Sequence, residues 1–436
     1  MVRLTWVVAV LLAAIQAPFI AAGPSPVVSP NCKVAEDAKP TSTSSAPSPS
    51  VSASSATKMT QVDTSAPTTP EVTPSPVTTA LAVVTSAPTT AAPTETPAPT
   101  TQAPAPETPA PTVSDTFASP LAAITYSSVG GSGMYGKVTS MSCPGTGQGT
   151  CVQEDHAISG PLAPFDEDLT LALRGPLQVD NIAVFTAGSN SNASSSSWIK
   201  VSAYSRANDN AMQNMVLLNS KGDKTKSGEF SMCHGNSQSY ATSDGTTVAT
   251  SANAFSGVLA DGVEINMMSE STCDSASDTC GFSRGVAYEG WRGASKIFMV
   301  QAQMPHAEGK DAPAIWLLNG QVVRTAEYGC NCRGIGGSGK WKGGCGELDI
   351  AEVLPEDKNA LTSTMYSFKG SRGAAPISMR PTDASIVFVV VFSGETSQVQ
   401  ILLMRPEDVD VETPPTPERV QKWLDYRNGE QVNFDI

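Results

Sequence analysis

The chain has 436 residues, with 41 acidic and 27 basic side chains and a formal net charge of −14. This acidic balance argues against a nucleic-acid partner, because phosphates need a basic surface. The three histidines, His156, His234 and His306, are widely separated and show no metal-ligand spacing, and the sequence has no phosphate-binding loop or Gly-x-Ser-x-Gly motif. We therefore expect neither a metal nor another cofactor.

The N-terminus has the layout of a cleaved secretory signal. Arg3 precedes an apolar run over residues 4–15, and small residues follow at 21–23, which is the order found in signal peptides. A membrane anchor is the alternative interpretation, but the run is shorter than the ~20 residues that span a bilayer. We predict a signal peptide over residues 1–22 and a secreted protein, extracellular or associated with a cell wall, without a membrane span.

The segment over residues 23–116 is dominated by Ser, Thr, Pro, Ala and Val. Such a composition buries too little apolar surface to offset the entropy of ordering the chain. Together with loose repeats such as APTETPAPTT, it predicts a disordered, O-glycosylated stalk. Its expected role is to hold a folded head away from a wall or matrix, and an inert flexible linker is the alternative.

From residue 117 onward, short β-like runs alternate with Gly, Ser and Asn. The expected strands are rich in β-branched and aromatic residues and cover 169–175, 181–187, 198–204, 215–219, 296–304, 314–319, 385–392 and 398–404. The last two are joined by a short turn-like sequence and predict a hairpin. Many strands with turn-rich joints indicate an all-β fold, an antiparallel β-sandwich or jelly roll.

One short helix is expected near the C-terminus. Thr416 suits its N-cap, Pro417 its first position and Gly429 its end. Upstream, Asn192 lies in an Asn-Ala-Ser sequon within a Ser-rich loop, which predicts an exposed N-glycosylation site.

Nine cysteines are present, and Cys32 stands apart from the rest. The other eight allow up to four disulfides in an oxidising compartment. Cys143 with Cys151, and Cys273 with Cys280, are plausible local pairs. The sequence leaves the pairing of four cysteines open: Cys233, Cys330, Cys332 and Cys345. Zinc is the alternative for the last three, but a C-x-C pair without a second pair or histidines nearby is a poor zinc pattern, which favours disulfides.

Three carboxylates lie close together in the stretch GCGELDIAEVLPED: Glu347, Asp349 and Glu352. Side chains alternate along a strand, so Glu347 and Asp349 would share one face and Glu352 would point away. One bulged residue near Ile350–Ala351 would return Glu352 to the acidic face, whereas in a helix the two glutamates would lie about 140° apart. Retaining glycoside cleavage needs two carboxyls about 5–5.5 Å apart. A bulged strand could provide them, and a solvated charged edge is the other interpretation.

Several separated blocks of the sequence resemble one known family. The blocks DAPAIWLLNGQVVRTAEYGCNC, KWKGGCGELDIAEVL and CGFSRGVAYEGWRGASKIFMVQAQMP, together with residues 124–141 and 166–177, resemble the TOS-type glycosyl hydrolases of fungal and related cell walls. The resemblance covers residues 120–405. It implies an N-terminal Gly-rich β module over 117–190, packed on a β-jelly-roll glycosyl hydrolase-like domain over 191–436.

That family is similar in its core to the laminarinase and lichenase group, which are family 16-like β-glucanases. These are concanavalin-like jelly rolls with an E-x-D-x-E or bulged E-x-D-x-x-E strand, and Glu347, Asp349 and Glu352 match the bulged form. The resemblance implies Glu347 as nucleophile, Asp349 as its helper and Glu352 as acid/base of a retaining enzyme. It implies a β-glucan of the cell wall as the partner, with β-1,3 linkages expected. We expect a monomer.

Aromatic side chains near the acids are expected to stack on sugar rings. The resemblance places Trp316, on the strand before the acidic one, in the cleft. The other candidate substrate contacts are Trp341, Arg324, Tyr328, Tyr366 and Trp291. A tryptophan in a sandwich is also at home in the core, and Arg324 could equally form a structural ion pair.

The sequence departs from the laminarinase group at two places. That group commonly has a histidine on the strand after the acids, where this chain has Met365 and Tyr366. The insertion over 333–340 lengthens the cysteine-rich loop before the acidic strand. Both departures concern substrate subsites and leave the three acids in place.

Two other functions fit parts of the sequence. A lectin-like or structural wall protein would bind glucan without cleaving it, and an adhesin or effector would be displayed on the stalk. The three adjacent acids favour the enzyme, because a binding protein has no need to place three carboxylates together. Hydrolysis and transglycosylation share a covalent intermediate, and the sequence does not separate them.

Overall fold

The structure is a computed structural model that describes residues 117–145, 149–188, 193, 197–273, 280–327, 329–333 and 344–435. Several predictions lie outside these residues: the signal peptide, the stalk, and the side chains of Asn192, Tyr328 and Trp341. Within the described residues, no helix is long and apolar enough to cross a membrane.

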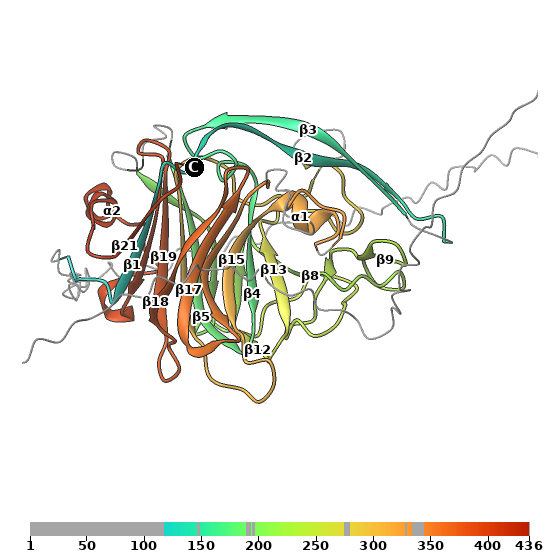
Figure 1. Cartoon of the computed structure of the whole chain (residues 1–436). Coiled ribbons are helices and arrows are strands. Elements are labelled where there is room, and N and C mark those ends of the chain that lie inside the picture. The colour runs from blue at the N-terminus through green and yellow to red at the C-terminus, as the bar shows by residue number, and fades with distance from the viewer. Residues whose placement is uncertain are drawn as a thin grey trace, which may run out of the picture. The chain divides into compact units, whose positions relative to one another are not determined.

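The described residues fold into two large β-sheets that pack face to face, which confirms the predicted antiparallel sandwich (Figure 1). Sheet I has the strand order β21 (Glu430–Asn433), β1 (Ala122–Ser127), β20 (Gln398–Met404), β19 (Ile386–Ser393), β14 (Lys296–Gln303), β5 (Leu177–Ala187), β6 (Trp198–Ser205) and β7 (Ala211–Gln213), with β12 (Val258–Leu259) also on β5. Its pairs are antiparallel except that β21 runs parallel to β1.

Sheet II is antiparallel throughout. Its strand order is β11 (Ser239–Tyr240), β8 (Val216–Asn219), β13 (Glu264–Met268), β4 (Leu169–Arg174), β15 (Ala314–Asn319), β16 (Glu347–Leu354), β17 (Asp357–Ser367) and β18 (Gly370–Met379). The carboxylate-bearing strand β16 is therefore interior to this sheet, with a paired strand on each side.

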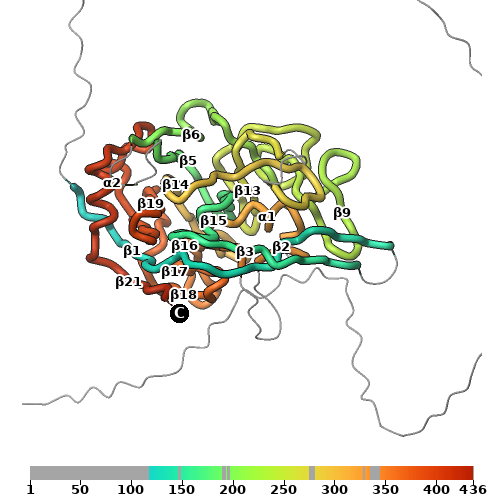
Figure 2. Tube along the Cα trace, turned by 90° about the horizontal axis from the view of Figure 1, so that it is seen from above, coloured from blue at the N-terminus to red at the C-terminus, as the bar shows by residue number. Residues whose placement is uncertain are grey.

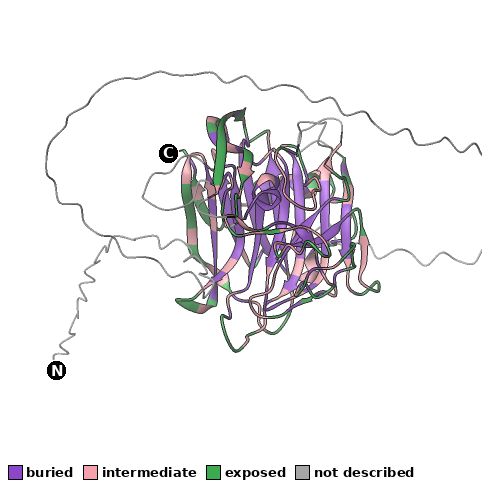
Figure 3. Cartoon of the chain, turned by 90° about the vertical axis from the view of Figure 1, so that its right-hand side faces the viewer, coloured by how far each residue is buried: buried purple, intermediate pink, exposed green. Residues whose placement is uncertain are grey.

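The core lies between the sheets, and apolar runs make both inner faces. Phe298 and Val390 of sheet I belong to the same buried cluster as Leu171, Leu317 and Leu348 of sheet II. Both faces of β19 are buried: Val390 lies in this core, whereas its neighbours Val389 and Val391 belong to a second cluster on the other face, because side chains alternate along a strand. Buried residues gather in the strands of both sheets, and exposed ones gather in loops and at edges (Figure 3).

The outer face of sheet I is covered by the C-terminal helix α2 (Pro417–Leu424), which follows a 3-10 turn at Pro406–Asp408. Thr416 caps α2 as predicted, because its side chain accepts a hydrogen bond from the backbone N–H of Arg419, and Pro417 is the first helical residue. The helix ends at Leu424, five residues before Gly429, which instead leads into β21.

A long hairpin and a short helix lie beside sheet II (Figures 1 and 2). The hairpin is β2 (Gly131–Ser142) with β3 (Thr150–Gly160), and α1 (Gly320–Arg324) follows β15. Tyr135 of β2 accepts a hydrogen bond from Gln321 of α1 over 2.7 Å. A second hairpin, β9 (Phe230–Ser231) with β10 (Gly235–Asn236), lies in the chain before β11.

Residues 117–190, expected to be a module packed on the core, supply strands to both large sheets. β1 and β5 belong to sheet I, β4 belongs to sheet II between β13 and β15, and only the β2–β3 hairpin stands apart. The strands predicted from 169 to 404 all occur in the structure, and β19 and β20 form the predicted hairpin.

The described residues contain four disulfides, the largest number that the eight cysteines allow. The local pair Cys273–Cys280 is confirmed. The other three bonds are Cys143–Cys233, Cys151–Cys330 and Cys332–Cys345. The predicted pair Cys143–Cys151 is wrong. In the β2–β3 ladder Cys151 is paired with Met141, and Cys143 follows the last paired residue of β2.

Candidate active site

The acidic strand β16 contains the predicted bulge. Along β15, Trp316 is paired with Asp349 and the preceding residue, Ile315, is paired with Ala351, so Ile350 is an extra residue. The ladder to β17 shifts over the same interval, between Asp349 and Glu352. A single extra residue reverses the alternation of side chains, and the bulge at Ile350–Ala351 is thereby confirmed from both neighbouring strands.

The register places the three acids on one face of sheet II, because directly paired residues share a face. Glu347, Asp349 and Glu352 are paired on β15 with Leu318, Trp316 and Ala314, and on β17 with Tyr366, Thr364 and Thr362. The β15 partners belong to the apolar cluster on the outer side of sheet II. The residues between the acids, Leu348, Ile350 and Ala351, belong to the core between the sheets.

Glu347 is held by an arginine that the sequence did not single out. Both of its carboxylate oxygens accept hydrogen bonds from Arg333, from Nε and from Nη2. The Glu347 side chain is 5% exposed and that of Arg333 is 17% exposed. This is therefore a largely buried bidentate pair, the geometry in which arginine and carboxylate bind most strongly. Arg333 follows Cys332, whose disulfide partner Cys345 lies two residues before Glu347.

A second cross-link fixes the segment that carries Arg333. Cys330 is bonded to Cys151 of β3, and Gln153 of the same strand donates a hydrogen bond to the carbonyl of Asn331 over 2.5 Å. The Asn331 side chain in turn accepts a hydrogen bond from the backbone N–H of Arg333. The position of Arg333 thus depends on the β2–β3 hairpin.

Glu352 also has an arginine partner. Arg174, at the end of β4, donates from Nη2 to Glu352 over 2.9 Å and lies 3.5 Å from a carboxylate oxygen of Glu264 on β13. Its guanidinium carbon is 5.8 Å from the centre of the Trp316 ring, within the range of a cation–π contact. Trp316 is almost wholly buried on the acidic face, within the apolar cluster there.

Asp349 lies between the two glutamates and has no ion-pair partner among the described residues. Burial raises the pKa of Asp349 well above its usual range, and the charges of Glu347 and then Glu352 add to the effect. Tyr366 lies beside Glu347 on the same face, and burial followed by the charge of Asp349 raises the pKa of its phenol. These mutual charges indicate that the acids and Tyr366 lie within electrostatic reach of one another.

A fourth buried carboxyl, Glu327, lies near this group and was missed from the sequence. It accepts a hydrogen bond from Ser220 over 2.7 Å. Burial, with the charge of Glu264 next, raises the pKa of Glu327 to about 7, and Arg333 and Glu347 also act on it. The sequence signal for Glu327 is weak, because it follows α1 in an irregular segment and forms no regular spacing with the three acids.

Two other predicted contacts are in the interior. Arg324 is fully buried, forms an ion pair with Asp168 and donates to the carbonyls of Cys280 and Tyr288. It therefore forms the structural ion pair that the sequence left as an alternative. Trp291 lies in the core between the sheets, and its indole N–H donates to Ser202 over 2.8 Å.

The comparisons with known proteins agree on one family. A family model described as "Cell wall protein YJL171C/Tos1, C-terminal" matches residues 196–423, and the corresponding N-terminal model matches 122–187. No solved structure matches the chain.

Curated relatives carry a common description. A Saccharomyces cerevisiae protein named "Probable circularly permuted 1,3-beta-glucanase TOS1" is 34% identical over 222 residues, which are 48% of this chain and 46% of that protein. A second yeast protein with the same description, YJL171C, is 35% identical over 248 residues, 51% of this chain and 58% of its own length. An Arthroderma benhamiae relative, also described in this way, is 25% identical over 418 residues, 72% of this chain and 91% of its own.

The matched part of this chain spans about half the length of the first of these relatives. The C-terminal family model alone covers more than half of this chain, and the N-terminal model precedes it in the same order as in the family. The chain belongs to the YJL171C/Tos1 family of cell wall proteins.

Proposed function

We propose that this protein is a cell-wall enzyme that cleaves or rearranges β-glucan with retention of anomeric configuration, and that its substrate is β-1,3-linked. The observation that carries the proposal is the bulge at Ile350–Ala351, because it brings Glu347, Asp349 and Glu352 to one face. The relatives named 1,3-beta-glucanases support the substrate class.

In the proposed reaction, Glu347 attacks the anomeric carbon while Glu352 gives a proton to the departing glycosidic oxygen. This step forms an ester between Glu347 and the sugar and releases the first product. Glu352 then takes a proton from water or from a sugar hydroxyl, whose oxygen displaces Glu347. Water gives hydrolysis and a sugar hydroxyl gives transglycosylation.

Asp349 and the aromatic residues have supporting roles in this proposal. Since the pKa of Asp349 is raised, it can carry a proton and donate a hydrogen bond to a neighbouring glutamate, which reduces repulsion among three acids. Trp316 and Tyr366 lie on the acidic face and are the proposed sugar contacts. Arg324 and Trp291 are buried elsewhere and have no role in the proposed reaction.

One observation favours a second candidate, a wall protein that binds glucan without cleaving it. Both oxygens of Glu347 are engaged by Arg333, and the carboxylate is nearly buried. A nucleophile must present one oxygen to the anomeric carbon, so Arg333 would have to release that oxygen when sugar binds. If it does not, the acid face serves as a structural ion-pair network.

The two candidates are separated by incubating the full-length protein with laminarin and following oligosaccharide products by chromatography. We expect wild type to release shorter or transfer longer oligosaccharides, and Glu347→Gln and Glu352→Gln to be at least about 10³-fold slower. Glu356→Gln is the matched control, because Glu356 is exposed just beyond the end of β16. Binding of laminarin without any product from wild type would reject the enzyme and leave the binding protein.

A further inference from the structure

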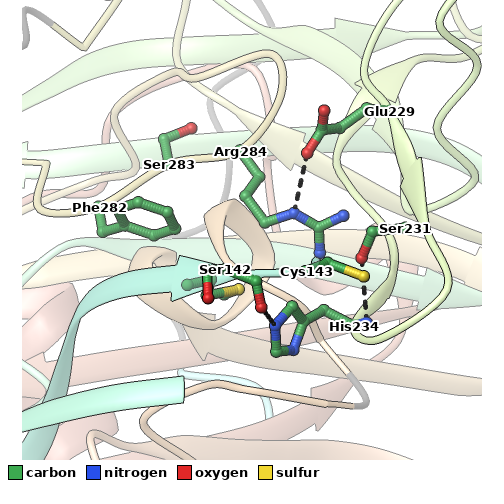
Figure 4. A pocket seen from close by; sticks show the side chains of 9 residues that line it. Ser142, Cys143, Glu229, Ser231, His234, Phe282, Ser283 and Arg284 are labelled. Carbon is green, nitrogen blue, oxygen red and sulfur yellow. Dashed lines mark hydrogen bonds and ion pairs between the residues drawn. The ribbon is translucent and has the colours of Figure 1, made fainter. Parts of the chain in front are cut away.

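A hollow of about 290 Å³ lies away from the acidic strand, between the end of β2, the β9–β10 hairpin and the segment after Cys280 (Figure 4). Glu229, His234, Phe282, Ser283 and Arg284 are among its lining residues. Phe282 and Ser283 lie on one side of it and the hairpin residues on the other, with the Arg284 side chain between them. A volume near the low end of the ~300–1,000 Å³ found for small-molecule sites suits one sugar-sized ring.

The hollow is built from segments that disulfides hold in place. Cys143 at the end of β2 is bonded to Cys233 in the turn of the hairpin, and Cys273 is bonded to Cys280 just before Phe282. His234 adds a hydrogen bond of 3.1 Å from its ring to the carbonyl of Ser142. A preformed site loses less entropy when a ligand binds, so the cross-links favour a binding role for these walls.

Arg284, which lines the hollow, has an unused hydrogen-bond donor. Its side chain is only 6% exposed, with Nε bonded to Glu229 over 3.2 Å and Nη2 to the carbonyl of Gly235 over 3.0 Å. Nη1 is buried and has no hydrogen-bond partner among the described residues, and the same is true of the hydroxyl of Ser283. A buried polar group without a partner costs about 1–3 kcal/mol, and a ligand that supplies the partner recovers this cost.

Acceptors stand beside these donors. The backbone carbonyl of Ser142 can only accept a hydrogen bond, so the Nε2 of His234 carries a hydrogen and donates it to that carbonyl. In this tautomer of the neutral ring, Nδ1 is a hydrogen-bond acceptor. Glu229 uses one carboxylate oxygen for Arg284, and its side chain is 39% exposed. The site therefore offers donors, acceptors and the aromatic ring of Phe282 to the same ligand.

These groups favour a neutral, hydroxyl-rich ligand over an anion. Among the residues that line this first hollow, the one arginine is already paired with Glu229, so an added anion would meet the Glu229 carboxylate. A sugar hydroxyl both accepts and donates, so one hydroxyl can accept from Arg284 and donate to Glu229. A sugar ring also has an apolar face that can pack on an aromatic side chain.

A second hollow of about 550 Å³ continues from the first. It shares Glu229 and Arg284 with it and is also lined by Lys224, Ser227 and Val286. Val286 is hydrogen-bonded to the segment before β11, and β11 is five strands from β16 in sheet II. At about 4.8 Å per strand, the two places lie roughly 24 Å apart along the sheet, so a sugar bound here would not touch the acids.

We propose that the hollow around Arg284 is a second glycan-binding site, which takes a neutral oligosaccharide, stacks one ring on Phe282 and bonds its hydroxyls to Arg284, Ser283 and Glu229. The site does not depend on cleavage at β16. It would hold a polysaccharide strand to the protein whether or not the acidic strand acts on that strand.

The test is hydrogen exchange followed by mass spectrometry on the full-length protein carrying Glu352→Gln, which prevents turnover if the acids are catalytic. The probes are laminaritetraose, cellotetraose and chitotetraose, with inorganic phosphate as the anionic comparison. We expect at least one oligosaccharide to protect residues 229–236 and 280–286 from exchange. Protection by phosphate alone, or protection by sugars confined to β16 and its neighbours, would overturn the proposal.

Variants of the lining residues give the second readout, the affinity for the protecting oligosaccharide by calorimetry. Ser283→Ala removes a hydroxyl that has no partner in the protein, so the fold is unaffected, and affinity should fall roughly three- to tenfold. Phe282→Ala should weaken binding at least about tenfold through lost apolar contact.

Phe230→Ala is the matched control, because Phe230 is an exposed aromatic residue on the same hairpin and does not line the hollow. Equal affinity in wild type, Ser283→Ala and Phe282→Ala contradicts the second site. If Glu347→Gln no longer cleaves laminarin but still binds sugar at residues 280–286, this site is distinct from the proposed active site. The proposed function can therefore fail while the binding site stands, and the reverse also holds.

Discussion

Arg333→Ala should destabilise the protein strongly, because it removes the ion-pair partner of a buried carboxylate. Glu347 is 5% exposed and both its oxygens are bonded to Arg333. Removing one member of a buried ion pair leaves the other charge desolvated and uncompensated, which costs about 3–5 kcal/mol. The cost comes from the charge left on Glu347, so removing that charge as well should cancel most of it.

The measurement is urea unfolding of the full-length protein at pH 7 with its disulfides intact, with the midpoint and slope compared between variants. The double variant Arg333→Ala/Glu347→Gln removes the charge as well as its partner. We expect it to regain most of the stability lost by Arg333→Ala alone. The difference is the coupling energy of the pair.

Arg405→Ala is the matched control, since Arg405 is 51% exposed and pairs with Asp408 over 3.4 Å on the surface. Exposed pairs contribute only about 0–1 kcal/mol, so this variant should stay close to wild type. A loss below about 1 kcal/mol for Arg333→Ala at pH 7, or a loss independent of Glu347, would refute the reasoning that Arg333 stabilises the acid site.

Three further predictions concern the strand, a loop and a helix. Asp349→Asn should raise the melting temperature at pH 7. The pKa of Asp349 is raised in the folded state, so its contribution to stability is present at low pH and is lost as the pH rises through that pKa. The gain in melting temperature should therefore vanish towards pH 3.5, and an equal gain at both pH values would contradict the burial argument. Replacing Cys332 and Cys345 with serine opens a bond between residues 13 positions apart and should cost about 3 kcal/mol in urea unfolding, whereas an unchanged midpoint would mean that the bond constrains nothing. Thr416→Ala should cost about 1 kcal/mol because it removes the α2 cap, with Thr416→Ser as a control that retains it.

Much of the sandwich could be predicted because its strands are locally encoded. The β-branched runs at 385–392 and 398–404 have no competing helical period, and both became central strands. The bulge was also readable, since the five-residue spacing of Glu347 and Glu352 allows a shared face only with one extra residue. By contrast, the short strand β21 has exposed side chains and is held by backbone pairing to β1, which leaves no hydrophobic pattern in the sequence.

The partners of the acids could not be predicted, because they come from distant parts of the chain. Arg174 reaches Glu352 across 178 positions, and only the strand order of sheet II brings them together. Arg333 is closer in sequence, and its place after Cys332 is the one signal available, but the pairing of that cysteine was open. The wrong Cys143–Cys151 pair has the same origin, since closeness in sequence does not reveal which residue lies opposite in a ladder.

Because two disulfides hold the segment that carries Arg333, the geometry of the acid site depends on the redox state of the compartment in which the chain folds. Thiols remain reduced in the cytosol and are oxidised in the secretory pathway. In a reduced chain, Cys332 would be unlinked from Cys345 and Cys330 from Cys151, so nothing covalent would hold Arg333 over Glu347. We therefore expect these two disulfides to form only after export to an oxidising compartment. Protein made in a reducing host would then have a folded apolar core, but Arg333 would not be fixed beside Glu347.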